Sequence, residues 1–88
     1  MKIVRKVQVK NAMGLHTRPA TTIVKLLQNC PCDVTFTHKQ DTVNAKSILS
    51  LLMLAATKNS KITIVVEGDE ADVTMNKLVQ AFENQFGE

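Results

Sequence analysis

A histidine beside a compact anion-binding sequence is the strongest chemical feature of this chain. Gly14–Ala20 reads Gly-Leu-His-Thr-Arg-Pro-Ala, and Pro19 suits the first turn of a helix, where its missing N–H costs nothing. The unpaired N–H groups and the dipole at such a helix start attract an anion, and the Arg18 guanidinium can bind one as a fork. Because an imidazole can act as a covalent nucleophile, the segment predicts a phosphate site with His16 at its edge.

Each of the reactive residues also has a plainer, structural interpretation. A histidine ahead of a helix commonly serves only as its cap, and Ser47, just ahead of an apolar run, has the position of an N-cap. Cys30 and Cys32 supply at most half of a zinc site, and a disulfide across one residue would be strained. We therefore expect two free thiols in a reducing compartment, with neither a metal nor a cofactor.

The first half of the chain contains the elements that must position His16. Residues 3–9 read as a strand, and a helix fits from Thr17 because apolar side chains recur at helical spacing, namely Ala20, Ile23, Val24 and Leu27. The sequence 29–33, with its proline, ends that helix. Alternation of apolar and polar residues then predicts a strand over 34–37 and a returning strand over 42–45, joined by a polar turn.

The second half predicts a helix, a strand and a last helix. The apolar run 48–54 wraps nearly all the way round a short helix, so part of it should lie exposed as a docking patch. Asn59 and Ser60 are predicted to end this helix. Residues 61–66 alternate as a strand, Gly68 turns the chain, and a final helix carries the core stripe Met75, Leu78, Val79, Phe82 and Phe86. The order β-α-β-β-α-β-α predicts an α+β fold, a two-layer open-faced sandwich with three helices on one face of a four-stranded antiparallel sheet.

Length and composition exclude several classes of protein. The 88 residues suit one domain, 1–88, with a thin core and no room for a large cofactor cradle. The three aromatic residues are all Phe, so a base-stacking surface for nucleic acid is not expected. No apolar run approaches the length of a membrane span, and the charged start lacks the apolar stretch of a signal peptide. The chain is therefore predicted to be cytoplasmic.

The charges are unevenly distributed along the sequence. Residues 1–66 hold ten basic residues and two acidic ones, a balance of +8, whereas residues 67–88 hold one basic residue and six acidic ones, a balance of −5. If this separation survives folding, one face is positive and suits an acidic partner or a phosphate. A solvated face without a partner is the commoner outcome of such a pattern.

The segment Gly14–Ala20 resembles the active-site motif of HPr, the histidine phosphocarrier family of the bacterial phosphoenolpyruvate-dependent phosphotransferase system. Asn44–Ile48 resembles the second family motif, and the resemblance covers essentially the whole chain. It implies a phosphocarrier rather than an enzyme, with His16 accepting a phosphoryl group from phospho-enzyme I and passing it to an enzyme IIA protein. Arg18 would balance the phosphate charge, and Ser47 would be a regulatory phosphorylation site.

The same resemblance implies the partners and their docking surface. Apolar and small residues beside the two motifs would contact the partners, here Thr17, Ala20, Ile48, Leu49 and Leu52. The implied partners are enzyme I, enzyme IIA proteins and, for Ser47, an HPr serine kinase/phosphorylase, with a monomer as the expected state. Leu51–Leu54 and Phe82–Phe86 are also similar to the nitrogen-branch paralogue, NPr. The alternative is therefore a regulatory binding module that acts mainly through phosphorylation-dependent contacts.

Overall fold

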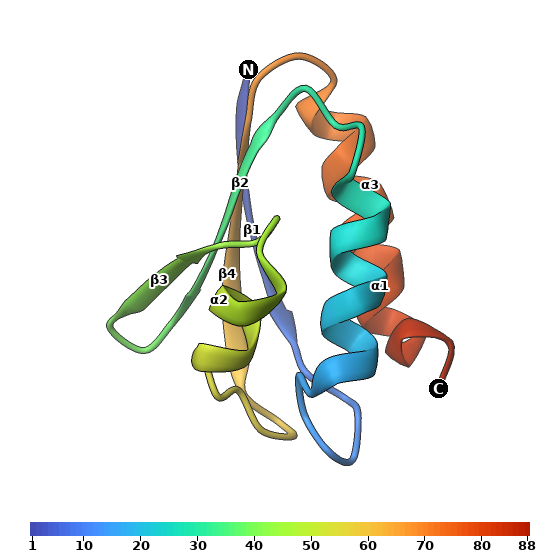
Figure 1. Cartoon of the computed structure of the whole chain (residues 1–88). Helices are drawn as coiled ribbons and strands as arrows, with labels where there is room; N and C mark the ends of the chain where they lie inside the picture. Colours follow the sequence, from blue (N-terminus) through green and yellow to red (C-terminus); the bar gives the residue numbers. More distant parts are fainter.

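The computed structural model describes residues 1–88 and shows the element order that the sequence predicts (Figure 1). The elements are β1 (Lys2–Gln8), α1 (Thr17–Leu27), β2 (Asp33–His38), β3 (Asp41–Asn44), α2 (Ile48–Met53), β4 (Lys61–Glu67) and α3 (Ala71–Glu83), followed by the 3-10 turn η1 (Gln85–Gly87). None of these helices is both long enough and apolar enough to cross a membrane.

The four strands form one antiparallel sheet in the order β1-β4-β2-β3. β4 is central: its Ile64 lies opposite Arg5 of β1 on one side and Phe36 of β2 on the other. The three α-helices cover one face of this sheet and leave the other face open (Figure 1). The predicted α+β class and two-layer arrangement are confirmed.

The core lies between the sheet and the helices. There the alternating apolar residues of the strands contact the apolar stripes of the helices. Ile62, Ile64 and Val66 of β4 point inward at every second position and are fully buried. They meet the apolar stripes of the two long helices, which are Ala20, Ile23 and Leu27 of α1 and Met75, Leu78 and Phe82 of α3. Since α1 packs beside α3 over this core, the start of α1 is held in a fixed position at one end of the molecule (Figure 1).

The second helix is shorter than the sequence predicts. It ends at Met53, and the following Ala55 takes a left-handed conformation with φ 55°, although Asn59 was the expected stop. The reason is a contact outside the helix, because the Ala56 carbonyl accepts a hydrogen bond from the Leu15 N–H at 2.9 Å. Asn59, with φ 75°, instead closes the turn into β4, its N–H donating to the Val9 carbonyl at 2.7 Å.

The prediction that Phe86 belongs to the stripe of the last helix is wrong. α3 ends at Glu83, and Gln85 and Phe86 both take positive φ values, which turn the chain out of the helix. Phe86 still packs on the edge of Phe82, with ring centroids 4.8 Å apart. This turn brings the last residues back beside the start of α1 (Figure 1).

Candidate functional site

The start of α1 presents His16 and Arg18 together. His16 occupies the N-cap position in an extended conformation, and its carbonyl accepts the Ala20 N–H at 3.1 Å. Its ring makes no capping hydrogen bond, so the side chain is not committed to capping the helix. The N–H groups of Thr17 and Arg18 precede the first intrahelical bond and point out of the helix end, where an anion can reach them.

Gly14 allows the loop before α1 to pass close to the chain that follows α2. Its φ is +68°, and a Cβ built there would collide with the carbonyl oxygen of Ala56. That oxygen accepts the Leu15 N–H, and the Gly14 N–H donates to the Asn11 carbonyl at 3.0 Å. The loop is therefore fixed on both sides of Gly14, and this fixes the place where the chain enters α1 at His16.

Gly14→Ala should destabilise the protein. The added Cβ would collide with the backbone of Ala56, which cannot move aside as a flexible side chain could. The positive φ of this position is also one that alanine rarely adopts. We expect the free energy of unfolding to fall by about 1–3 kcal/mol. Urea unfolding followed by circular dichroism measures the change. Gly87→Ala is the control for positive φ alone, since a Cβ there meets nothing within 4 Å. A Gly14→Ala variant no less stable than Gly87→Ala would contradict this account of the loop.

A carboxylate from the other end of the chain contacts the histidine. Glu88 Oε2 lies 3.1 Å and Oε1 3.3 Å from His16 Nε2, and Oε2 lies 3.8 Å from Arg18 Nε. Asn11 Nδ2 donates to Glu88 Oε1 at 2.6 Å and to the Gln85 carbonyl at 2.8 Å, which ties down the returning segment. These residues surround a cavity of about 310 Å³, whose lining is Asn11, Ala12, Met13, His16, Arg18, Gln85 and Glu88.

The charge balance of the site differs from the positive environment that the sequence predicts. Partial burial of Glu88 opposes its ionisation, but hydrogen bonds from Asn11 and His16, with the charges of His16 and Arg18, outweigh it and hold the pKa of Glu88 below its usual value. Sequence analysis missed both Asn11 and Glu88. Glu88 is 72 residues from His16, and the contact depends on the turn at Gln85 and Phe86, which no local pattern announces.

The lowered pKa of Glu88 predicts a pH-dependent contribution to stability. A carboxyl whose pKa is lower in the folded state stabilises the fold above its unfolded pKa, and the contribution is lost as the pH falls through the folded value. Glu88→Gln should therefore be less stable than the unmodified chain at neutral pH and equally stable in acid. Urea unfolding at a series of pH values gives the comparison. A stability difference that stays constant down to strongly acidic pH would show that the ionised carboxylate contributes nothing.

Ser47 caps α2, as its position in the sequence predicts. Its Oγ accepts the Ser50 N–H at 3.2 Å, and its backbone is extended, with φ −116° and ψ 118°. The side chain is half-buried at the start of the helix. The N-terminal N–H groups of α2 and the Ser47 hydroxyl therefore lie together at the surface.

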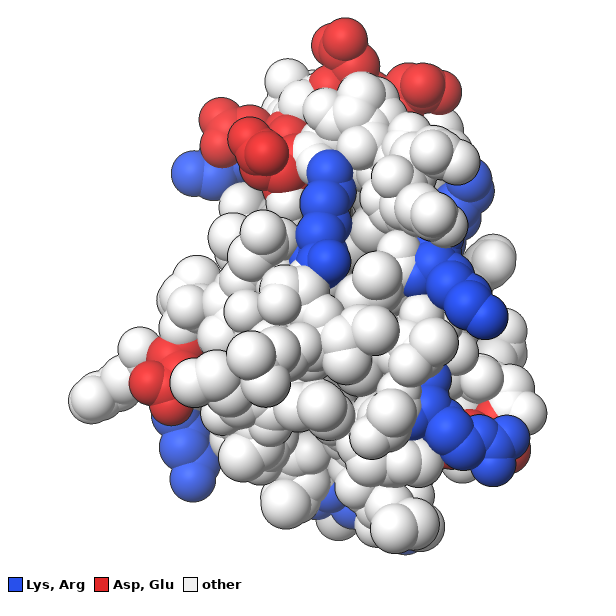
Figure 2. Space-filling model, viewed as in Figure 1, with Lys and Arg blue, Asp and Glu red and all other residues white.

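The prediction that part of the apolar run lies exposed is confirmed. Leu51 and Leu54 are buried, whereas the outer face of α2 exposes Ile48, Leu49, Leu52 and Met53, which we call the apolar patch. Met53 was not among the predicted docking residues, although it is 73% exposed. Figure 2 shows that the surface over α2 and the start of α1 is largely uncharged, with Lys and Arg side chains around it.

Of the other two residues predicted to dock partners, Thr17 is exposed and Ala20 is not. Ala20 has no accessible surface, since it lies one helical turn before Ile23 on the stripe that packs against the sheet. A fully buried side chain cannot contact a partner, so the docking role predicted for Ala20 is wrong.

Four of the six acidic residues in 67–88 lie away from this site, whereas Glu88 is part of it. Asp33 and Glu67 lie opposite each other where β2 begins and β4 ends, and Asp69, Glu70 and Asp72 follow in the turn into α3. Figure 2 shows most of the visible Asp and Glu side chains at this end of the molecule, opposite the start of α1. The separation of charge along the sequence therefore becomes a partial separation in space.

Comparison with known proteins identifies the family. The family model for the PTS HPr component phosphorylation site matches residues 3–84. The chain is 46% identical over 80 residues to phosphocarrier protein HPr of Chlamydia muridarum, covering 91% of this chain and 77% of that protein. A crystal structure of HPr from Thermoanaerobacter tengcongensis superposes with a TM-score of 0.93 at 29% identity, covering 98% and 97% of the two chains.

A second structure from that organism, an HPr dimer, has a TM-score of 0.78 at 30% identity and covers 93% and 94% of the two chains, so the expectation of a monomer is not confirmed. Both the sequence and the structure thus match the same family over nearly their whole length. The chain belongs to the HPr family of the phosphotransferase system, whose members are phosphocarrier proteins and not enzymes.

Proposed function

We propose that His16 accepts a phosphoryl group from phospho-enzyme I and passes it to an enzyme IIA protein. The observation that carries this proposal is the position of the His16 ring at the unpaired N–H end of α1, beside Arg18. Membership in the HPr family supports a carrier role, and the geometry supports this histidine as the carrier. The other histidine, His38, is half-buried on β2, with its Nδ1 3.3 Å from the Leu54 carbonyl oxygen.

The contacts of the His16 ring favour Nδ1 as the phosphorylated atom. A carboxylate only accepts hydrogen bonds, so Nε2 must donate its proton to Glu88. In the neutral ring this leaves the lone pair on Nδ1, which makes no hydrogen bond within the protein. In the transfer, this lone pair forms the new N–P bond while the bond from phosphorus to the donor nitrogen breaks on the opposite side.

The helix start would hold the transferred phosphoryl group. The N–H groups of Thr17 and Arg18 and the positive end of the α1 dipole favour the added negative charge. The Arg18 side chain is 80% exposed and free to swing onto the phosphate. Because Glu88 also contacts His16 and Arg18, the arriving dianion would repel its carboxylate, and we expect this end of the chain to move aside.

The apolar patch and Thr17 would form the surface that docks each partner. An exposed apolar helix face next to the reactive ring can exclude water from the transfer, which protects the phosphoryl group from hydrolysis. The lysines and arginines around the patch would favour acidic partners. Ser47 borders the patch and is the site where an HPr serine kinase/phosphorylase would regulate docking.

The remaining parts of the proposal concern location, assembly and pathway. Both cysteines are free thiols, which supports a reducing compartment and therefore the cytoplasm. The protein would act as a monomer, since the apolar patch must be open to reach a partner. The receiving enzyme IIA protein decides between two roles. If that protein serves sugar uptake, the chain is a carrier in transport. If it belongs to the nitrogen branch, the chain has the alternative role of a regulatory module.

Incubation with phosphoenolpyruvate and enzyme I, followed by intact-mass measurement, tests this function. We expect the mass of one phosphoryl group to be added, to be lost in acid as a phosphohistidine is, and to move to an added enzyme IIA protein. A protein that stays unmodified when both components are present, while a known HPr in the same mixture is labelled, would refute the proposal.

A further inference from the structure

Two cysteines and a threonine form a cluster at the end of α1 that lies away from His16. Cys30 and Cys32 stand on the segment between α1 and β2, and Thr74 faces them from α3. α1 has 11 residues and therefore spans about 16 Å between the two ends. The phosphocarrier role uses none of these three side chains.

The surroundings of Cys30 stabilise a thiolate. Its Sγ lies 3.3 Å from the Thr74 hydroxyl oxygen and accepts the Cys32 backbone N–H at 3.3 Å, so a thiolate there would accept two hydrogen bonds. Burial raises the pKa of the Cys30 thiol, but these hydrogen bonds and the charge of Lys46 outweigh it and lower the pKa below its usual value. Cys30 is half-buried and so remains accessible to a small reagent.

The neighbouring Cys32 is the opposite kind of thiol. It is 1% exposed, and its Sγ donates to the Asp69 carbonyl at 2.7 Å. Burial and the adjacent Cys30 sulfur raise the pKa of the Cys32 thiol. A bond between two cysteines separated by one residue would also be strained. Cys32 is thus poorly placed to displace a group attached to Cys30.

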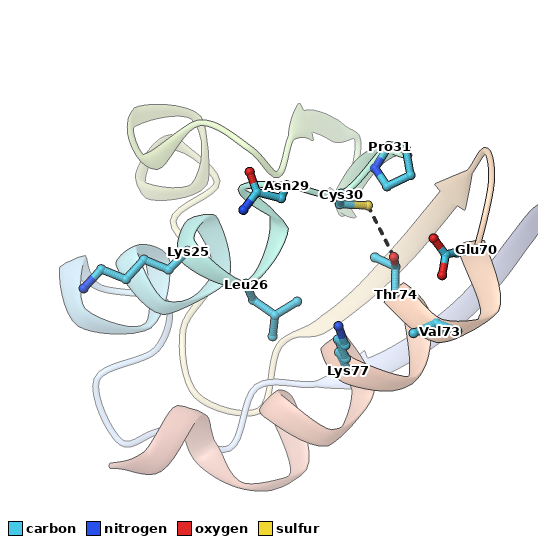
Figure 3. Close-up of a pocket in the computed structure, with 9 residues that line it drawn as sticks. All are labelled: Lys25, Leu26, Asn29, Cys30, Pro31, Glu70, Val73, Thr74 and Lys77. Atoms are coloured by element: carbon cyan, nitrogen blue, oxygen red, sulfur yellow. Dashed lines mark hydrogen bonds between the residues drawn. The ribbon is translucent and has the colours of Figure 1, made fainter.

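Cys30 lines a cavity that has room for such a group. The cavity has a volume of about 300 Å³, at the lower end for small-molecule sites, and Figure 3 shows the Cys30 sulfur directed across it toward Thr74. Its charged lining residues are Lys25 and Lys77, against a single carboxylate, Glu70. Lys46 adds a further positive charge nearby, with its Nζ donating to the Cys30 carbonyl at 2.9 Å. Asp69 and Asp72 flank Glu70 outside the lining, but the lining itself carries more positive than negative charge, and this local excess favours an anionic group inside the cavity.

We propose that Cys30 is a site of S-thiolation by a small acidic disulfide of the glutathione class. The Cys30 thiolate attacks one sulfur of the disulfide, forming a mixed disulfide, while the S–S bond of the reagent breaks and its other half leaves as a thiolate that takes a proton from water. The incoming group occupies the cavity, with its carboxylates facing the lysines. Because Cys32 is poorly placed to displace it, the modification persists until an external thiol removes it.

The test compares glutathione disulfide with the neutral bis(2-hydroxyethyl) disulfide. Folded protein is treated at neutral pH, and intact mass and peptide mapping report the rate and the site. We expect one modification, at Cys30, formed with glutathione disulfide about three- to tenfold faster than on the same chain unfolded in urea. Cys30→Ser should remove it, and added dithiothreitol should reverse it.

Charge variants show whether the cavity recognises the anionic group. Lys77→Gln should slow the reaction with glutathione disulfide about two- to fivefold and leave the neutral disulfide unaffected. Lys61→Gln makes the same charge change on β4 outside the cavity and should alter neither rate. Three results would each overturn the proposal. The first is modification at Cys32, and the second is a folded protein that reacts no faster than the unfolded chain. The third is a Lys77→Gln variant that loses the same factor in rate with both disulfides.

Discussion

His16→Ala should abolish phosphoenolpyruvate-dependent labelling of the protein while leaving its fold intact. The variant removes the only imidazole at the start of α1. The guanidinium of Arg18 stays protonated and is a poor nucleophile, and Thr17 offers only a hydroxyl. Stability should change little, because the ring is 27% exposed and makes no capping bond, so we expect a difference within about 1 kcal/mol. Intact mass after incubation with enzyme I and phosphoenolpyruvate measures the labelling, and a thermal melt reports the fold.

His38→Ala is the matched control for this experiment. It removes the other histidine of the chain, on β2, and should keep full labelling. Arg18→Gln is a second comparison: it should slow the transfer without abolishing it, because the helix N–H groups remain. Full labelling of His16→Ala, or loss of labelling in His38→Ala with the fold intact, would move the phosphorylation site away from His16.

The elements that position His16 could be predicted because each follows from local periodicity. The inward alternation of Ile62, Ile64 and Val66 marks β4, and the spacing of Ala20, Ile23 and Leu27 marks α1. The same stripe also shows why the docking role of Ala20 failed. A residue on the apolar stripe of an amphipathic helix faces the core, and closeness to the motif in sequence does not put it on the surface.

What the sequence did not reveal depends on contacts between distant segments. The second helix ends at Met53 because the chain must present the Ala56 carbonyl to Leu15, a contact between separate loops. The carboxylate of Glu88 reaches His16 only because the chain turns at Gln85 and Phe86 after α3. Neither feature has a periodic signal, so the helices were predictable but the electrostatics of the site were not.

Ser47→Asp should slow phosphoryl transfer from enzyme I by weakening binding, without unfolding the protein. Aspartate is as good an N-cap as serine, so it can accept the Ser50 N–H, and its charge suits the positive end of the α2 dipole. Stability should therefore stay within about 0.5 kcal/mol. The new charge, however, stands at the edge of the apolar patch, where it opposes desolvation and repels an acidic partner.

The effect of Ser47→Asp should appear in the dependence of the transfer rate on enzyme I concentration. We expect the rate at low enzyme I to fall about three- to tenfold and to recover toward the normal value at saturation, as a loss of binding requires. Ser47→Ala removes the cap without adding charge, so it should cost about 1 kcal/mol of stability and leave transfer unchanged. Asn76→Asp adds the same charge on the exposed face of α3 and should slow nothing. Aspartate carries less charge than a phosphate, so the variant tests the direction of the effect and underestimates its size. If Ser47→Asp transferred like the unmodified chain at every concentration, Ser47 would be reassigned as a helix cap.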